Sequence, residues 1–127
     1  MKRLSQTICF SLSVLWLASA CQLGGPEAVI KKFYRALEKG NLEEAVSLLS
    51  SRITETLGEE KIKTGLAEAA REMQQKGGVK SLEITQMNVT GEIADAQVKL
   101  KYGNGSIDTE KVRLIKEKGR WKIDVDK

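Results

Sequence analysis

The amino-acid sequence predicts an α+β domain in which three N-terminal helices precede a four-stranded antiparallel sheet, with a signal peptide before both. Apolar residues recur every three or four positions up to Gly78 and every second position after it, and these periods are typical of helices and strands. Turn sequences such as Gly103-Asn104-Gly105 separate the later apolar runs. Because the helices come before the strands and not between them, we expect them to pack on one face of the sheet.

Each expected helix has an apolar stripe and a clear end. The first covers Glu27–Lys39 and is stopped by Gly40, and the second begins after an Asn cap and covers residues 41–50. The third covers Glu59–Lys76 and is stopped by Gly77-Gly78. The inward-facing residues are Val29, Ile30, Phe33, Tyr34 and Leu37 in the first helix, Leu42, Ala45, Val46, Leu48 and Leu49 in the second, and Ile62, Leu66, Ala69 and Met73 in the third.

The strands alternate between apolar and polar residues, which indicates that one sheet face is buried and the other is wetted. The alternation changes phase between Ile84 and Met87, and this predicts a β-bulge near Thr85-Gln86. The apolar positions are Leu82, Ile84, Met87 and Val89 in the first strand, Ala94, Ala96, Val98, Leu100 and Tyr102 in the second, Val112 and Leu114 in the third, and Trp121, Ile123 and Val125 in the fourth.

The first twenty residues have the three regions of a secretory signal. Met1-Lys2-Arg3 is basic, residues 8–18 are almost wholly apolar, and Ala18-Ser19-Ala20 has the small side chains that a signal peptidase requires. The apolar run is shorter than the roughly 20 residues that cross a bilayer as a helix. We therefore expect residues 1–20 to be a cleaved signal peptide, residues 21–26 to be a tether, and residues 27–127 to form one domain.

The residues around Cys21 resemble a lipobox, the bacterial signal in which a cysteine receives lipid before cleavage. In Leu17-Ala18-Ser19-Ala20-Cys21 the position that usually holds Leu, Val or Ile is Ala18, so ordinary secretory cleavage with an unmodified Cys21 is the alternative. The second cysteine, Cys9, leaves with the signal, and lipid on Cys21 explains a thiol without a disulfide partner. Two or more acyl chains would hold the protein stably on a membrane. By the same resemblance, Gln22 indicates an exported lipoprotein of the cell envelope, on the outer membrane and facing the periplasm.

The composition excludes several classes of chemistry. The chain has no histidine, which removes Ser-His-Asp and Cys-His catalysis and histidine-ligated zinc. Removing Lys2 and Arg3 lowers the 21 basic side chains to 19 against 17 acidic ones, and this balance gives no reason to expect a nucleic-acid partner. We predict no metal and no cofactor.

Two segments carry a family resemblance. Residues 26–41 (Pro-Glu-Ala-Val-Ile-Lys-Lys-Phe-Tyr-Arg-Ala-Leu-Glu-Lys-Gly-Asn) and residues 116–123 (Lys-Glu-Lys-Gly-Arg-Trp-Lys-Ile) resemble the opening helix and final hairpin of the nuclear transport factor 2-like superfamily. Within it, the chain is most similar to small bacterial lipoproteins with a cystatin-like, lumazine-binding-like domain of unknown function. The resemblance implies a curved sheet that wraps a long helix and leaves a pocket. It does not imply one activity, because this fold hosts enzymes, carriers and protein-binding modules.

Five residues are candidates for the lining of that pocket. Tyr102 shares the apolar phase of its strand, and Tyr34 lies on the inner helix. Asp108 and Glu110 are in phase with the apolar residues of the third strand, and a carboxylate desolvated there would have a raised pKa. Trp121 could either fill the core or stack on a ligand. For each of these residues an ordinary structural role is also open, and we predict no catalytic residue.

The expected function is a non-enzymatic module that binds a small apolar ligand or another envelope protein, with a homodimer through paired sheets as a further expectation. The alternative is an isomerase, dehydratase or hydrolase that uses carboxylate and tyrosine chemistry, which requires Asp108 or Glu110 to be buried beside a tyrosine. The basic residues near the C-terminus could meet anionic lipid or protein, but their place on the wetted face favours an ordinary soluble surface. These residues are Lys111, Arg113, Lys116, Lys118, Arg120 and Lys122.

Overall fold

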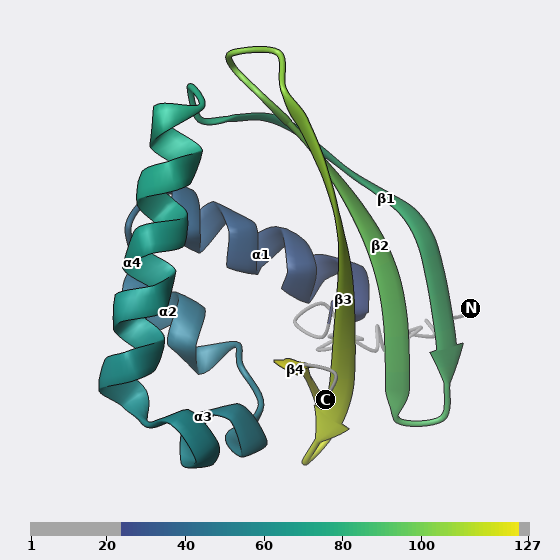
Figure 1. Cartoon of the computed structure of the whole chain (residues 1–127). Coiled ribbons are helices and arrows are strands. Elements are labelled where there is room, and N and C mark those ends of the chain that lie inside the picture. The colour runs from purple at the N-terminus through teal and green to yellow at the C-terminus, as the bar shows by residue number, and fades with distance from the viewer. Residues whose placement is uncertain (1–23, 125–127) are drawn as a thin grey trace, which may run out of the picture.

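The computed structural model describes residues 24–124, which form a helical layer against a curved sheet (Figure 1). Four helices come first and four strands follow, which confirms the predicted α+β class. The elements are α1 (Pro26–Glu38), α2 (Leu42–Ser47), α3 (Ser51–Leu57), α4 (Glu59–Gln75), β1 (Val79–Thr90), β2 (Ile93–Tyr102), β3 (Ile107–Glu117) and β4 (Arg120–Asp124).

The sheet is an antiparallel meander in the order β1-β2-β3-β4. The register of β1 against β2 shifts between Ile84 and Gln86, so the predicted β-bulge is confirmed. The predicted turn at Gly103-Asn104-Gly105 is present between β2 and β3, and Gly105 adopts the positive φ that a tight turn needs, as does Gly119 between β3 and β4. One face of the sheet lines the core, because alternate residues of β2 from Ala94 to Tyr102 are buried.

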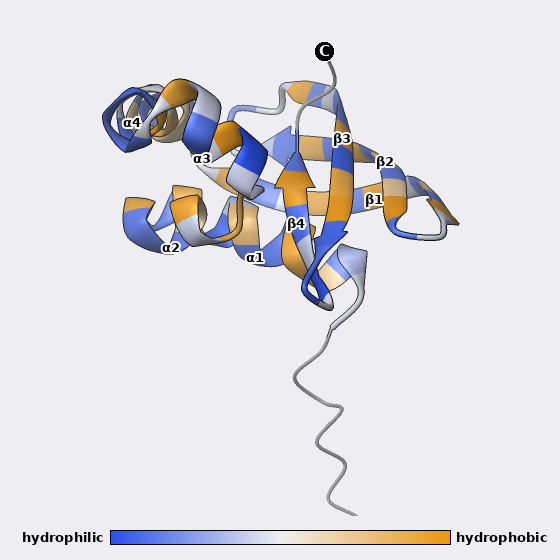
Figure 2. Ribbon diagram, turned by 90° about the horizontal axis from the view of Figure 1, so that it is seen from below, coloured by the Kyte–Doolittle hydropathy of each residue, from blue (hydrophilic) through white to orange (hydrophobic). Residues whose placement is uncertain are grey.

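Helix α1 lies on the inner face of the curved sheet (Figure 1). Pro26 occupies its first turn, where the missing N–H costs nothing, and Ile30, Tyr34 and Leu37 form a buried stripe at helical spacing. These side chains belong to one core with the buried residues of β2, with Leu114 and with the helices behind α1. Figure 2 shows the helices on one side of the sheet and the alternation of apolar and polar residues along the ribbon.

The structure has one more helix than the sequence predicted. The second helix ends at Ser47 and not at Ser50, and α3 begins directly afterwards with Ser50 as its N-cap. The Ser50 hydroxyl accepts a hydrogen bond from Ile53 N–H at 3.3 Å. Two backbone hydrogen bonds attach the segment between the helices to β4: Ser50 N–H to the Ile123 carbonyl at 2.7 Å, and Ile123 N–H to the Leu48 carbonyl at 2.8 Å. This tertiary contact fixes the point where α2 stops.

No helix between residues 24 and 124 is long and apolar enough to cross a membrane. The predicted signal peptide and the first half of the predicted tether, including Cys21, lie outside the described residues.

Candidate functional site

An apolar pocket of about 360 Å³ lies between the helices and the C-terminal half of the sheet. Helices α1, α3 and α4 form one side of it, and strands β3 and β4 form the other. Its volume is at the lower end of the range for small-molecule sites, and its lining is mostly hydrophobic, as is usual for such sites. The lining residues are Phe33, Tyr34, Leu49, Ile53, Leu57, Lys61, Ile62, Gly65, Leu66, Lys111, Val112, Ile123 and Asp124.

Gly65 lies in the middle of α4 and lines this pocket, and the residue is exposed to solvent. A Cβ atom built on Gly65 would have no atom within 4 Å, so the glycine is not required by close packing, and its φ is not positive. A glycine inside a helix costs roughly 0.5–1 kcal/mol relative to alanine. Helix α4 therefore carries this cost at a position that borders the pocket.

Three charged side chains stand among the apolar ones. Lys61 of α4 and Lys111 of β3 both line the pocket, and both are exposed to solvent, so their ammonium groups can reach its opening. Asp124 also lines the pocket, but its carboxylate is held by Ser50 and Arg52. The pocket thus combines an apolar interior with positive charge at its opening.

Tyr34 projects from α1 into the interior and donates a hydrogen bond from its hydroxyl to the Glu110 carboxylate. The Tyr34 residue is buried, whereas Glu110 as a residue is exposed. Burial is the largest cause that raises the pKa of the Tyr34 phenol above its ordinary value, and the hydrogen bond and negative charge of Glu110 add to it. Tyr34 is therefore a neutral hydrogen-bond donor at physiological pH.

Tyr102, Asp108 and Lys76 form a second polar cluster, nearer the β2–β3 hairpin. Lys76 Nζ lies 2.8 Å from Asp108 Oδ2 and 4.8 Å from the centre of the Tyr102 ring. The hydrogen bond from Lys76 is the main cause that lowers the pKa of Asp108. The sequence led us to expect a raised pKa for a carboxylate desolvated in the pocket. For Asp108 the pKa is lowered instead, because the hydrogen bond from Lys76 outweighs the effect of desolvation. Burial is the main cause that raises the pKa of Tyr102.

The predicted pocket residues are thus divided among several places. The register pairs Glu110 with Val98 and Asp108 with Leu100, so both carboxylates start from the inner sheet face, as the phase of β3 predicted. Of the candidates, Tyr34 lines the apolar pocket. Trp121 is half-buried at the other end of the sheet, where it packs on the core and lines a surface hollow, with Lys116 Nζ 5.6 Å from its ring centre.

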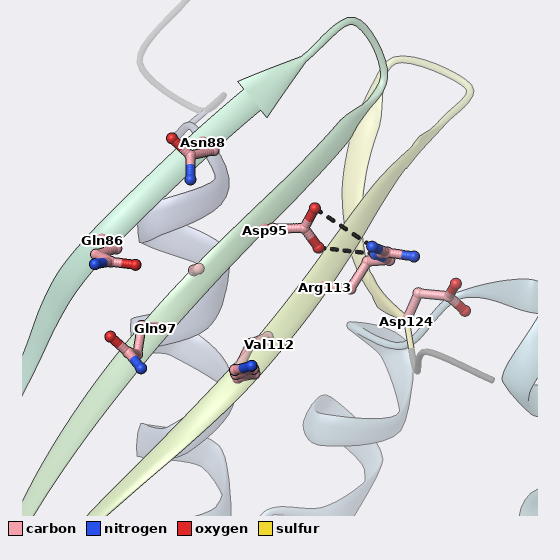
Figure 3. Close-up of a pocket in the computed structure, with 9 residues that line it drawn as sticks. Gln86, Asn88, Asp95, Gln97, Val112, Arg113 and Asp124 are labelled. Carbon is pink, nitrogen blue, oxygen red and sulfur yellow. Dashed lines mark hydrogen bonds and ion pairs between the residues drawn. The ribbon is translucent and has the colours of Figure 1, made fainter.

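The outer sheet face has a polar hollow of about 530 Å³ (Figure 3). Side chains from all four strands line it, among them Gln86, Asn88 and Gln97. Arg113 donates to Asp95 across strands β3 and β2, with Nε 2.8 Å from Oδ1. This row of amides and paired charges confirms that the outer face is the wetted one.

A comparison with protein-family models matches residues 19–124 to a domain of unknown function, DUF4878. The chain belongs to the DUF4878 family. No curated protein sequence matches it.

Solved structures place the DUF4878 domain in the NTF2-like fold. A crystal structure from Campylobacter jejuni, provisionally named an NTF2-like transpeptidase, is 24% identical with a TM-score of 0.71, and the match covers 81% of this chain and 100% of that one. A SEC-C motif protein from Rhodopseudomonas palustris is 14% identical with a TM-score of 0.57, covering 79% and 75%. A protein variant named Rd1NTF2_05 is 11% identical with a TM-score of 0.53, covering 76% and 90%. At these identities the likeness establishes the fold alone.

The DUF4878 pocket was predicted only in part, because seven of its thirteen lining residues are among the inward-facing residues expected from the sequence but only Tyr34 was assigned to a pocket. Ile53 and Leu57 enter it from α3, the helix that the periodicity missed, and Lys61 and Lys111 come from elements 50 residues apart. The helix glycine Gly65 was the one available sign, because glycine interrupts an otherwise regular helical pattern without ending it. Among residues 24–124 no group of three or more His, Cys, Asp or Glu side chains is placed to hold a metal ion.

Proposed function

We propose that this DUF4878 domain is a non-enzymatic binding module, held at a membrane surface by lipid on Cys21, whose pocket takes a small ligand with an apolar body and an anionic head. The observation that carries the proposal is the apolar pocket between the helices and strands β3 and β4, which Gly65 borders. Lys61 and Lys111 support the anionic head, because a charge at the opening stays solvated while the apolar body is buried.

Gly65→Leu is expected to fill the pocket and lower ligand affinity at least about ten-fold, which corresponds to about 1.4 kcal/mol of binding free energy. The fold should tolerate the change, because leucine is a better helix former than glycine and no atom lies within 4 Å of the new Cβ. The probes are 8-anilino-1-naphthalenesulfonate and its neutral analogue N-phenyl-1-naphthylamine, titrated by fluorescence. Circular dichroism checks that each variant is folded.

Two further variants are matched controls. Gly65→Ala adds one methyl group and should change the affinity only a few-fold, while Lys61→Gln should weaken binding of the sulfonate and leave the neutral probe unaffected. A wild-type chain that binds neither probe, or a folded Gly65→Leu variant that binds both equally well, would contradict the ligand proposal. Binding of another envelope protein would then be the better-supported function of this domain.

The anchor is tested by the intact mass of the full-length chain expressed in a bacterial host. We expect the wild type to lack residues 1–20, to carry acyl chains and to fractionate with membranes of the cell envelope, in accord with a periplasm-facing lipoprotein. Cys21→Ser should remain unprocessed. A wild-type chain that is soluble, unacylated and cleaved after Ala20 would replace the anchor with ordinary secretion.

The second candidate function is a hydrolase, isomerase or dehydratase that uses Tyr34 and Glu110. It is favoured by their hydrogen bond, which places a carboxylate and a phenol together beside the pocket. Glu110 is exposed and Asp108 is paired with Lys76, so neither carboxylate has the buried position that the enzyme hypothesis required. Mass spectrometry of a bound compound before and after incubation with the protein separates the two functions, because only an enzyme converts the compound into a different one.

A further inference from the structure

The hollow at the start of α1 has a basic lining, and the exposed Glu27 of the same helical turn is not part of that lining. A hollow of about 530 Å³ is formed where the first turn of α1 meets the β3–β4 hairpin, and its charged lining residues are Lys32, Lys116, Arg120 and Lys122, with no carboxylate among them. Figure 2 shows the same arrangement, with the hydrophilic tip of the β3–β4 hairpin beside the start of α1.

A second hollow continues this surface along α1. It shares Ala28 and Lys32 with the first and adds the exposed side chains of Lys31, Arg35 and Lys39. Seven lysines and arginines therefore line the two hollows, against one carboxylate, Glu44, which lies 3.9 Å from Lys32 Nζ. The nearby Glu117 is engaged by the backbone N–H and hydroxyl of Ser51. We call the surface formed by these seven cations the basic face.

The position of the basic face in the chain indicates what covers it. Gly24 and Gly25 line the first hollow, so the chain enters the described fold at this surface. Cys21 precedes Gly24 by three residues, which span at most about 10 Å when fully extended. That reach is close to the Debye length of about 10 Å at 0.1 M ionic strength. Charges on the basic face therefore lie within about one Debye length of a lipid surface that holds Cys21, where they are only partly screened.

We infer that the basic face docks on anionic lipid headgroups of the membrane that carries the anchor, and that Trp121 lies at the lipid–water interface. This inference rests on the proposed lipid attachment. Lysine and arginine side chains bind headgroup phosphates, and a half-buried tryptophan suits an interface that is apolar on one side and wet on the other. The docked orientation faces α1 and the β3–β4 hairpin toward the lipid. The sequence-based preference for an ordinary soluble surface rested on the basic residues near the C-terminus alone, without the lysines and the arginine of α1.

Trp121 supplies a site-specific readout, because the other tryptophan of the chain, Trp16, lies in the segment removed with the signal. The full-length chain is expressed, processed and reconstituted in vesicles of neutral phosphatidylcholine, with or without 30 mol% (about one lipid in three) of anionic phosphatidylglycerol. In anionic vesicles we expect a blue shift of Trp121 emission and quenching by brominated lipid. Both effects should be absent in neutral vesicles and should disappear at 1 M (about 3 Å Debye length) salt.

The variant pair Lys32→Gln with Arg120→Gln removes two charges from the basic face without touching Trp121. Each removed charge should lower the docked-to-undocked ratio about five-fold, so most of the anionic-lipid effect should be lost. The control pair Lys99→Gln with Lys101→Gln removes the same charge from exposed positions on β2 and should behave like the wild type.

Intact mass of the same preparations distinguishes failure of the docking from failure of the anchor. An acylated chain whose Trp121 emission is the same in neutral and anionic vesicles overturns the docking and leaves the anchor in place. A chain without acyl groups that still shows the anionic-lipid effect supports the docking and overturns the anchor. Equal losses in the test pair and the control pair would mean that net charge alone acts, and would overturn the basic face as a specific surface.

Discussion

Gly103→Ala is expected to lower the free energy of unfolding by about 2–4 kcal/mol. A Cβ atom on Gly103 would lie 2.4 Å from the carbonyl oxygen of Gly77, and backbone cannot rotate away as a side chain would. The contact joins the turn after α4 to the β2–β3 hairpin through two backbone hydrogen bonds. Gly103 N–H donates to the Gly78 carbonyl at 2.9 Å, and Asn104 N–H donates to the Lys76 carbonyl at 2.8 Å.

Urea unfolding followed by circular dichroism measures this loss, and the melting temperature should fall by roughly 10–20 °C. The control is Gly65→Ala, which also adds one methyl group but meets no atom within 4 Å, and it should stabilise the chain by about 0.5–1 kcal/mol. Opposite signs for the two substitutions are the expected pattern. A Gly103→Ala variant as stable as the wild type would show that the two turns do not approach as closely as described.

Arg52→Ala is expected to cost about 2–3 kcal/mol. The guanidinium of Arg52 donates twice to the Asp124 carboxylate, whose side chain is only 1% exposed, while the Ser50 hydroxyl donates to it at 2.6 Å. Removing the cation leaves a buried negative charge with less compensation. The expected loss is below the 3–5 kcal/mol typical of fully buried pairs because the Arg52 side chain is 48% exposed and water screens it.

The matched control for Arg52→Ala is Arg71→Ala, an exposed arginine of α4, which should change stability by less than about 0.5 kcal/mol. Adding Asp124→Asn to the Arg52→Ala variant should recover part of the loss, because the uncompensated charge is then gone. Equal losses of stability in Arg52→Ala and Arg71→Ala would mean that the ion pair does not couple α3 to β4. The same would follow if the total loss in the double variant equalled the sum of the losses in Arg52→Ala and Asp124→Asn measured singly.

The sheet could be predicted closely from the sequence because its signals are local. Alternation in β2 and the phase change near Gln86 depend only on neighbours in the chain, and both the strand and the bulge were confirmed. Helix α3 gave no such signal. It is seven residues long, contains the β-branched Ile53 and two threonines, and buries one side chain, so its stability comes from the contact of Ser50 with Ile123.

The candidate site was predicted less well because it depends on distant pairs. Tyr34 was assigned to the inner helix, but its partner Glu110 is 76 residues away, and periodicity cannot show which carboxylate it meets. The sequence likewise does not show that Lys76 reaches Asp108 and lowers its pKa. Charge balance over the whole chain also concealed the basic face, because a sum does not show how positive charges gather on one side.

The backbone contact between residues 48–50 and Ile123 has a consequence for self-association. An edge strand with free N–H and C=O groups is a template on which another chain can add a strand and begin a fibre. Along β4, the bridge between Leu49 and Ile123 already occupies part of that template. At the opposite edge, the irregular register at Ile84 and Gln86 breaks the flat repeat of β1, and Lys80 and Glu83 are exposed along it. Both edges of this open sheet are therefore poor starting points for aggregation.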